Sequence, residues 1–349
     1  MCTSKNRSAL RGRGVAANPK GRFESKEVTY TSERKRPKTT ILNGHAAGII
    51  STNASPDIPF DVSLNPYRGC EHGCAYCYAR PTHEFLGMSA GLDFETKIVA
   101  KRDAPQLLRE TIAKPSWKPQ VLVMSGVTDP YQPVERELKL TRGCIQVLSE
   151  TRHPLVIITK NGTVTRDIDL LLPLAGVGAV RVVVSVTSLD RDLIGVLEPR
   201  TSRPEKRLQA IRELSRAGIP VHVNIAPIIP GLNDTEVVSI LEAVKEAGAL
   251  SASYTLVRLP YGVKDLFSDW LAIHFPDRKE KVLNHIRACK GGVLNRSEFG
   301  DRFSGTGAYA RQIAAQVAIH KKRLGLDVPH PPLQANAFRR PQTAQLRLF

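Results

Sequence analysis

Three of the six cysteines of this 349-residue chain lie within eight residues of one another, at a spacing that suits a metal or an iron–sulfur cluster. The motif is Cys70-Glu-His-Gly-Cys74-Ala-Tyr-Cys77. Tetrahedral structural zinc needs a fourth protein ligand, and a ferredoxin-type cluster needs a fourth cysteine; neither follows at the usual place. Three thiolates alone would leave one iron of a 4Fe–4S cluster open to another ligand.

The remaining cysteines do not have the spacing of ligands. Cys144 and Cys289 recur with apolar residues at helical intervals, which predicts buried thiols. Cys2 lies in the basic N-terminal stretch. His72, inside the motif, could complete a zinc site, but we expect it to be a solvent-facing loop residue.

The surroundings of the motif resemble a known family. Arg68-Gly69 before the first cysteine and Tyr76 before the last are similar to the cluster loop of radical S-adenosylmethionine (radical SAM) enzymes. The likeness is greatest to the spore photoproduct lyase-like branch, also called DNA-repair-photolyase-like, and it extends over about residues 56–260.

That resemblance implies a 4Fe–4S cluster held by Cys70, Cys74 and Cys77, with S-adenosylmethionine (SAM) bound to the fourth iron. It implies an enzyme that takes one electron from a flavodoxin- or ferredoxin-like protein and cleaves SAM to a 5′-deoxyadenosyl radical. The radical removes hydrogen from a substrate, for which a DNA lesion or another nucleic acid is one candidate.

Apolar runs alternate with helix-like runs after the cysteine motif. Strands are predicted over 121–127, 154–159, 180–186, 220–229 and 253–259, with one more leading into the motif. A helix is predicted over 134–150, and two more after Ser202-x-x-Glu205 and Asn233-x-x-Glu236, which have the spacing of capping boxes. This pattern predicts an α/β fold with a helix-covered parallel sheet. It matches the partial (β/α)6 TIM-like barrel that the resemblance implies.

In such folds chemistry gathers at the carboxyl ends of the strands, where the resemblance implies the SAM contacts. Thr128 and Asp129 would contact the methionine amine, Lys160 would pair with its carboxylate, and Tyr76 would pack near the adenine. The other implied SAM contacts are Ser125, Gly126, Ser185, Thr187, Arg200 and Asn224. Each could instead be a strand-end turn or a cap, and Glu198 with Arg200 could be a surface ion pair.

Tyr76 and Tyr78 match tyrosines that take part in hydrogen return in spore photoproduct lyase. That enzyme also carries a hydrogen-donating cysteine just before its Thr/Ser-x-Asp turn, where this chain has Val127. The absent thiol argues against reversal of the spore thymine lesion.

Positive charge is concentrated at the termini. The net charge is +17, and residues 1–40 and 320–349 contribute +8 and +5 of it. We expect residues 1–55 to be a basic, mostly disordered arm, 56–300 the core domain, and 301–349 a helix followed by a basic disordered tail. These termini either solubilise the chain or attract DNA or RNA phosphates; a transit peptide is a third option. Because every predicted ligand follows Ser63, we expect removal of residues 1–40 to spare the cluster site.

The sequence also excludes a membrane span, because no apolar stretch approaches the ~18–20 residues that one needs. It has no signal-peptide pattern, so we expect a cytoplasmic protein. Two alternatives stay open: radical SAM modification of a protein or small molecule, and a non-enzymatic, zinc-containing nucleic-acid-binding protein.

Overall fold

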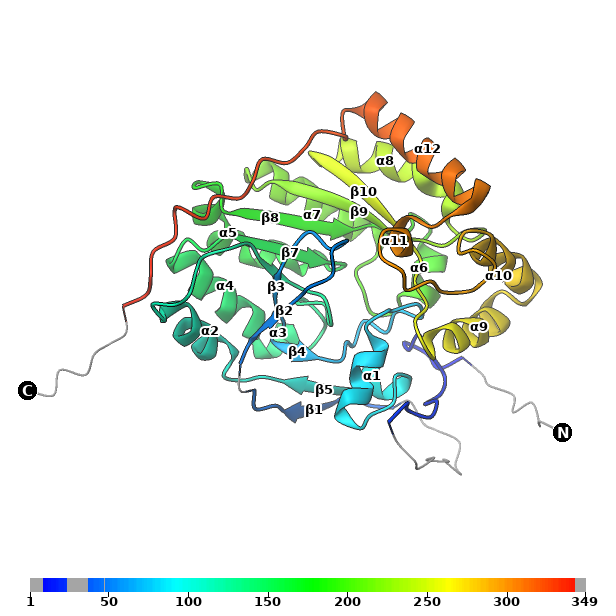
Figure 1. The fold of residues 1–349 in the computed structure, drawn as a ribbon, viewed down its shortest axis with the longest axis horizontal. Helices are drawn as coiled ribbons and strands as arrows, with labels where there is room; N and C mark the ends of the chain where they lie inside the picture. The colour runs from blue at the N-terminus through cyan, green and yellow to red at the C-terminus, as the bar shows by residue number, and fades with distance from the viewer. Residues whose placement is uncertain (1–8, 24–36, 47, 343–349) are drawn as a thin grey trace, which may run out of the picture.

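A curved seven-stranded sheet forms the centre of the computed structural model, which describes residues 9–23, 37–46 and 48–342 (Figure 1). Its strand order is β10-β9-β8-β7-β6-β3-β2. The parallel strands are β3 (Val62–Leu64), β6 (Leu122–Met124), β7 (Leu155–Thr159), β8 (Val180–Ser185), β9 (Val221–Ile228) and β10 (Ser251–Leu256). β2 (Ile50–Thr52) pairs antiparallel with β3 at one edge. The predicted α/β fold with six parallel strands is confirmed.

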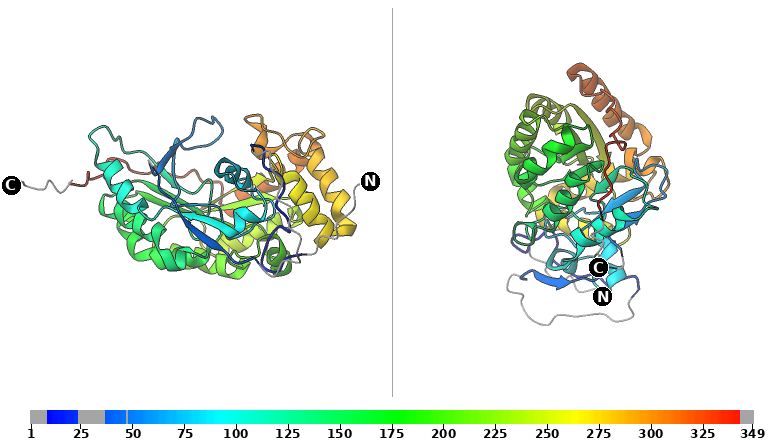
Figure 2. Two further views of the ribbon diagram at one scale, coloured as in Figure 1. Left: turned by 90° about the horizontal axis from the view of Figure 1, so that it is seen from below. Right: turned by 90° about the vertical axis from the view of Figure 1, so that its left-hand side faces the viewer.

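Helices cover one face of this sheet (Figure 2). They are α2 (Ala104–Ala113), α3 (Glu135–Leu138), α4 (Leu140–Glu150), α5 (Ile168–Ala175), α6 (Arg191–Leu197), α7 (Pro204–Arg216) and α8 (Val237–Glu246). After β10 follow α9 (Val263–His274), α10 (Lys279–Ala288), α11 (Asp301–Ser304) and α12 (Gly307–Leu324). Alternate strand residues face the helices, so Val180, Val182 and Val184 of β8 join the main core. The intervening residues face the inside of the open barrel.

A second, three-stranded sheet supports the cysteine motif. It consists of β1 (Thr40–Asn43), β5 (Lys97–Ala100) and β4 (Tyr67–Arg68), in that order. α1 (Leu92–Thr96) leads directly into β5. Because β4 ends immediately before Gly69 and Cys70, this sheet sets where the cysteine loop begins.

Several local predictions were wrong. The helix predicted over 134–150 is divided into α3 and α4 at Lys139. This residue has a left-handed backbone conformation, with a φ of 52°, which a continuous helix does not allow. Neither capping box forms: Ser202 donates to Asn161, and Asn233 donates to the carbonyls of Thr187 and Pro227. Ser202 thus bonds to the turn after β7, and Asn233 bonds to the ends of β8 and β9, rather than to their own helices.

The predicted disorder of the termini is wrong for the described residues. Within the range 1–55, β1 and β2 are paired strands, and Val15 is buried against Leu92 and Leu266. Part of the predicted disorder lies outside the described residues, namely at 1–8, 24–36, 47 and 343–349. The range 301–349, for which a helix was predicted, contains α12.

The C-terminal segment, residues 326–340, crosses the amino ends of the strands instead of leaving the fold (Figure 1). Leu326 is fully buried and accepts from Ala252 at the start of β10, and Gln334 donates to Gly178 before β8. Arg339 donates to Thr151 before β7, and Arg340 donates to the carbonyl of Trp117 before β6. The segment therefore contacts successive βα units along the floor of the barrel.

Two histidines fasten this segment under the sheet. His330 Nε2 lies 2.8 Å from His222 Nδ1 and also bonds Ser251. Burial lowers the pKa of His222 to about 3, with the charges of His330, Arg181 and Lys321 adding to the effect. Burial, Arg181 and Lys321 lower the pKa of His330 to about 4. Both rings are thus held neutral.

We expect the protein to lose stability as the pH falls from about 6.5 towards 4. The unfolded chain binds protons on these histidines near pH 6.5, whereas the folded chain resists them down to pKa values of about 3 and 4. His330→Gln should therefore flatten the dependence of the unfolding free energy on pH, measured by urea unfolding. His45→Gln, at an exposed position, is the control; equal pH dependence in the two variants would contradict the assignment.

None of the described helices is long and apolar enough to cross a membrane.

Candidate active site

The cysteine loop lies between the small sheet and α6. Gly69 has a φ of 78°, and a Cβ there would come within 3.0 Å of the Phe94 carbonyl, so glycine is required. The Cys70 amide donates to that carbonyl, and the Ala75 amide donates to Leu197 O at the end of α6. Cys70 and Cys74 are buried, whereas Cys77 is partly exposed. The loop is thereby fixed at both ends, with one thiol near the surface.

The loop offers three free thiols, and thiolates are the protein ligands of iron–sulfur clusters. Burial raises the pKa of Cys74 well above its usual value, and Glu198 and Cys77 raise it further. Burial and Cys70 raise the pKa of Cys77 to about 11. Thiolates so close together need a compensating positive centre.

A fully buried ion pair lies beneath the loop. Arg80 Nη2 and Glu95 Oε1 are 2.5 Å apart, and neither side chain is exposed. Arg80 also donates to the Cys74 carbonyl through Nε and Nη2, and to the carbonyls of Ala90 and Gly91 through Nη1. The guanidinium therefore connects the middle of the cysteine loop to the segment before α1.

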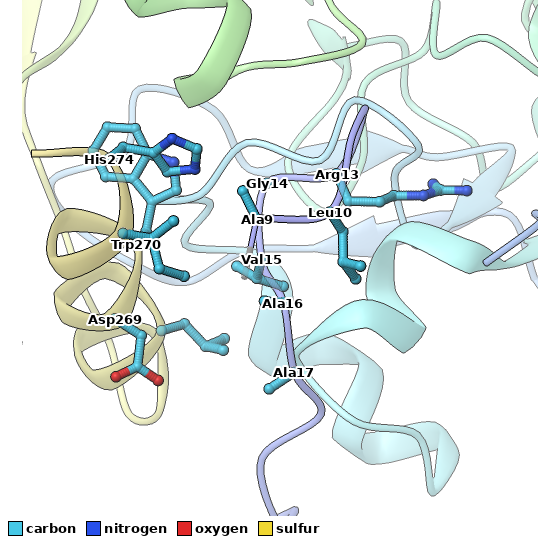
Figure 3. A pocket seen from close by; sticks show the side chains of 12 residues that line it. Ala9, Leu10, Arg13, Gly14, Val15, Ala16, Ala17, Asp269, Trp270 and His274 are labelled. Carbon is cyan, nitrogen blue, oxygen red and sulfur yellow. The ribbon is translucent and has the colours of Figure 1, made fainter. Parts of the chain in front are cut away.

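The N-terminal segment, residues 9–23, packs on the other side of the same carboxylate. Glu95 accepts from the amides of Gly14 and Val15, at 3.0 and 3.2 Å. A Cβ on Gly14 would lie 1.6 Å from the Gly73 carbonyl, so this segment touches the cysteine loop directly. Figure 3 shows it along α9, opposite Trp270, in a small pocket. The expectation that residues 1–40 can be removed without affecting the cluster site is therefore not supported.

We expect Gly14→Val to reduce the iron retained by anaerobically purified protein. The added side chain collides with Gly73 and separates two amides from Glu95, each a bond to a charged group worth about 1.5–3 kcal/mol. Removal of residues 1–17 should have the same effect.

Gly48→Ala is the control, because a Cβ there meets nothing within 4 Å. Full iron content in both the Gly14→Val and truncated proteins would show that the segment does not support the loop.

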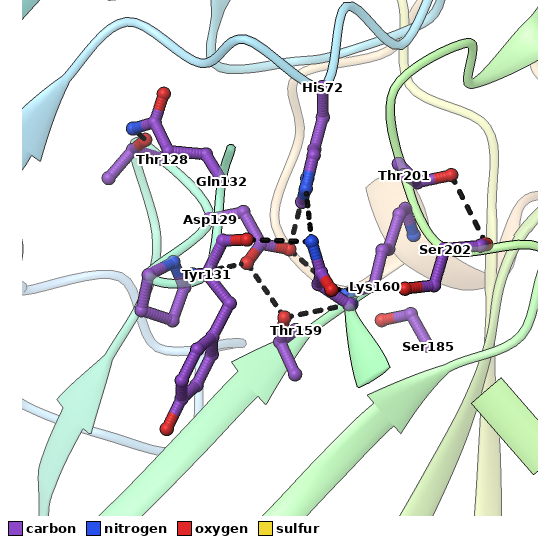
Figure 4. Close-up of polar contacts among 12 residues, drawn as sticks. His72, Thr128, Asp129, Tyr131, Gln132, Thr159, Lys160, Ser185, Thr201 and Ser202 are labelled. Carbon is purple, nitrogen blue, oxygen red and sulfur yellow. Dashed lines mark hydrogen bonds and ion pairs between the residues drawn. The ribbon is translucent and has the colours of Figure 1, made fainter. Parts of the chain in front are cut away.

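Asp129 is the centre of a polar network at the carboxyl ends of β6 and β7 (Figure 4). Its Oδ1 accepts from Thr159 Oγ1 and the Tyr131 amide, at 2.7 and 2.9 Å, and its Oδ2 accepts from the Lys160 amide at 2.8 Å. His72 Nδ1 lies 3.4 Å from Oδ2. Burial would raise the pKa of Asp129, but His72 and these hydrogen bonds hold it below its usual value.

His72 is buried, so the expectation of a solvent-facing residue was wrong. Burial would lower its pKa, but Asp129 and Cys70 raise it to about 10. Its other ring nitrogen, Nε2, lies 3.2 Å from the side-chain nitrogen Nδ2 of Asn161. The ring links the cysteine loop to the turn after β7.

Thr128 joins the loop from the same side. Its hydroxyl donates to the Gly69 carbonyl at 2.6 Å and accepts from Gln132 at 2.9 Å. Thr128 and Asp129 thus both bind groups of the protein that position the cysteine loop and Lys160. Their direct contact with the methionine amine stays a prediction.

Glu198 joins a second group of predicted residues. This carboxylate, wholly buried, accepts from Tyr76, from Arg207 and from Thr187 Oγ1, the last at 2.6 Å. Lys160 Nζ lies 3.9 Å from Glu198 Oε1 and donates to the Ala226 carbonyl at 2.8 Å. Burial would raise the pKa of Glu198, but Arg207, Lys160 and the hydrogen bonds lower it to about 2. A surface ion pair with Arg200 was therefore the wrong alternative.

The remaining predicted SAM contacts lie outside the two polar groups around Asp129 and Glu198. Ser185 and Asn224 are register partners on β8 and β9. Gly126 has a φ of 115° and open space where a Cβ would be, and it follows Ser125 at the end of β6. Arg200 instead pairs with Glu71 at 3.0 Å. Its guanidinium is thus committed to the far side of the cysteine loop.

Tyr78 lies at the rim rather than inside. Its side chain is 51 % exposed, whereas Tyr76 is 6 % exposed. The two tyrosines predicted to take part in hydrogen return therefore have different environments, and only Tyr76 touches the Glu198 group.

Sequence reasoning missed Arg207, Glu95 and Arg80, which are charged and fully buried. A signal for Arg207 was present, because it lies on the same helical stripe as Ile211 and Leu214, both in the core. An arginine on an apolar stripe indicates a buried partner. Arg80 and Glu95 lie outside any such stripe, and only the fold brings them together.

Replacement of Glu198 by alanine should lower the free energy of unfolding by about 3–5 kcal/mol, because it leaves the buried Arg207 without its partner. Glu205→Ala removes a carboxylate from an ion pair in which both side chains are more than half exposed; it should cost less than about 1 kcal/mol. Urea unfolding of both variants measures the difference, and equal losses would contradict the buried-pair assignment.

Comparison with known proteins identifies the family. The model of the Radical SAM superfamily matches residues 64–244, just over half of the chain, from the end of β3 to α8. The chain belongs to the radical SAM superfamily. The matched region contains the cysteine loop and both polar groups described above, and the predicted family is confirmed.

Curated relatives share the sequence over this region. Uncharacterized proteins of Mycobacterium tuberculosis and Mycobacterium bovis are 36 % identical over 222 residues, 63 % of this chain. The match spans 65 % of their own length, slightly less than two thirds. An uncharacterized protein of Methanocaldococcus jannaschii is 28 % identical over 63 % of this chain and 79 % of its own.

The fold is that of spore photoproduct lyase. The structure of that enzyme complexed with dinucleoside spore photoproduct matches with a TM-score of 0.59 at 17 % identity, over 87 % of this chain and 86 % of the other. A variant of it with bound AdoMet and the same dinucleoside matches with a TM-score of 0.58, again at 17 % identity, over 87 % and 86 %. At this identity the likeness concerns the fold.

Proposed function

We propose that this protein is a radical SAM enzyme that acts on a nucleic acid. The observation that carries the proposal is the fixed loop with Cys70, Cys74 and Cys77 at the carboxyl ends of the strands. These thiols would hold a 4Fe–4S cluster, and when bound, the cluster and SAM supply a 5′-deoxyadenosyl radical by one-electron cleavage of SAM. A flavodoxin- or ferredoxin-like protein would supply the electron.

The chain's own residues would bind and orient SAM. Lys160 offers an ammonium group beside the loop, fixed by Asp129 through its amide and by Ala226 through Nζ. A lysine so held suits the methionine carboxylate. Tyr76, whose ring lies 5.9 Å from Lys160 Nζ, would border the adenine. Ser125, Gly126 and Asn224 would line the rest of the nucleoside site.

A nucleic acid is the substrate that the charge favours. The formal net charge of +17 suits a polyanion, and the enzyme with the matching fold is one complexed with a dinucleoside. Val127 still stands where a thiol donor would be needed, and the described thiols outside the loop, Cys144 and Cys289, are buried in the core. We therefore propose a nucleic-acid substrate other than the spore thymine lesion.

The decisive test is reconstitution under anaerobic conditions. The protein should bind about four iron and four sulfide per chain and form 5′-deoxyadenosine when SAM and dithionite are added. Cys74→Ala should lose both properties, because two thiols cannot hold the cluster firmly. Cys144→Ala should keep its iron, since that thiol lies in the core.

One zinc per chain with no sulfide would instead support the non-enzymatic, nucleic-acid-binding alternative. Normal iron content in Cys74→Ala would remove the basis for the cluster assignment. Modification of a protein or small molecule would take first place if 5′-deoxyadenosine forms but neither DNA nor RNA is bound.

A further inference from the structure

An alternating series of rings and guanidinium groups extends outward from the cysteine loop. Tyr78 follows Cys77, and the Arg258 guanidinium carbon lies 5.8 Å from its ring centre. The same guanidinium is 4.9 Å from the ring of Phe303. Arg302 lies 4.9 Å from Phe303 and 4.9 Å from Phe299. We call Tyr78, Arg258, Phe303, Arg302 and Phe299 the ring–guanidinium ladder.

The ladder is held at the carboxyl end of β10. Arg258 comes two residues after β10, where the Leu259 amide donates to Asn295. α11, which carries Arg302 and Phe303, packs against β10 (Figure 1). Arg302 donates to Asp57 of the β2–β3 hairpin at 2.6 Å, so the opposite edge of the sheet fastens it as well. The ladder is therefore fixed to both edges of the seven-stranded sheet.

Arg258 differs from Arg80 and Arg207, because no carboxylate of the described residues lies within ion-pair distance of it. Arg80 pairs with Glu95 and Arg207 with Glu198. Within the described parts of the chain, the Nε of Arg258 has no hydrogen-bond partner, and no carboxylate lies at ion-pair distance from this guanidinium. Burial and the neighbouring Arg302 lower its pKa, and the weaker opposing effects of Tyr78 and Asp57 do not offset them. The cation is thus incompletely solvated and unpaired, which an anion would correct.

Two aromatic members of the ladder are largely exposed. Phe299 is 59 % exposed and Tyr78 is 51 % exposed. Large rings at the surface, interleaved with arginines, are the combination that binds single-stranded nucleic acid, because bases stack on rings and phosphates bind guanidinium groups. A rigid duplex would not bring its bases to these rings. A protein partner would not require the alternation of charge and ring.

We propose that the ring–guanidinium ladder binds an unpaired segment of nucleic acid beside the cysteine loop, with Arg258 on a phosphate and Tyr78 and Phe299 stacked on bases. This inference rests on the proposed nucleic-acid substrate and specifies its form: single-stranded or extruded nucleotides. It also places one stacked base next to Cys77, at the mouth of the barrel.

The test measures fluorescence anisotropy of a labelled eight-residue thymidine oligonucleotide with the cluster-loaded protein. Arg258→Gln should weaken binding at least about tenfold, and it should reduce the slope of log affinity against log salt by about 0.7. Arg216→Gln is the matched control, because it removes the same charge from an exposed position at the end of α7. Arg258→Lys should recover part of the affinity.

Two altered oligonucleotides separate phosphate binding from stacking. With methylphosphonate linkages, which carry no charge, Arg258→Gln and the unchanged protein should bind equally. With an abasic strand, Phe299→Ala should bind like the unchanged protein, although it binds the thymidine strand several-fold more weakly. Because Phe299 is exposed, this variant tests the ladder even if Arg258→Gln does not fold.

Equal affinities of Arg258→Gln and Arg216→Gln for the thymidine strand would overturn the proposal. So would tighter binding of a duplex of the same length, or displacement of the strand by poly-glutamate as effective as by unlabelled oligonucleotide. Iron content and 5′-deoxyadenosine formation by the unchanged protein report separately on the proposed function. Failure of the chemistry is thereby distinguished from failure of the ladder.

Discussion

The buried ion pair between Arg80 and Glu95 is the contact on which the arrangement of the cysteine loop depends. Each ion alone would be strongly unfavourable in this dry position, and the pair is tolerated only because both groups are fully hydrogen-bonded. Arg80 donates to the Cys74 carbonyl, and Glu95 accepts from two amides of the N-terminal segment. A stretch far away in sequence thus completes the support of a loop that must hold three thiols in one arrangement.

The same principle recurs on the other side of the loop. Glu198 and Arg207 are a second pair with no exposure, and around them lie Tyr76, Thr187 and Lys160. Asp129 holds His72 and the Lys160 amide from β6. Lys160 is therefore positioned by two independent carboxylates, one through its backbone and one near its ammonium group. Such fixed groups suit the binding of a charged cofactor, because little reorganisation is needed when it arrives.

The periodic parts of the fold could be predicted from the sequence, and the polar interior could not. β7 and β8 were placed almost to the residue, because apolar strands between amphipathic helices have a distinctive pattern. Asp129 and Lys160 could be singled out as candidates because they follow such strands. His72, by contrast, gave no local sign of burial, and Ser202 matched a capping box while serving the turn at Asn161. Contacts between segments that are distant in the sequence produce no periodic pattern, so they could not be predicted from it.

The charge of the termini was likewise a poor predictor of their structure. Their composition resembles that of disordered tails, yet Val15, Leu326 and His330 are packed against the barrel at its two ends. Arg22, for example, lies 3.8 Å from the ring of Tyr261, so this basic residue contacts the β10–α9 loop instead of extending into solvent. Excess charge is therefore a poor guide to where a polyanion binds. Arginines that already have a carboxylate, such as Arg80 and Arg207, add to the number of basic residues, but together with their partners they add neither net charge nor recognition. An unpaired guanidinium between two rings, as at Arg258, is the more specific sign, because the fold leaves it in need of an anion.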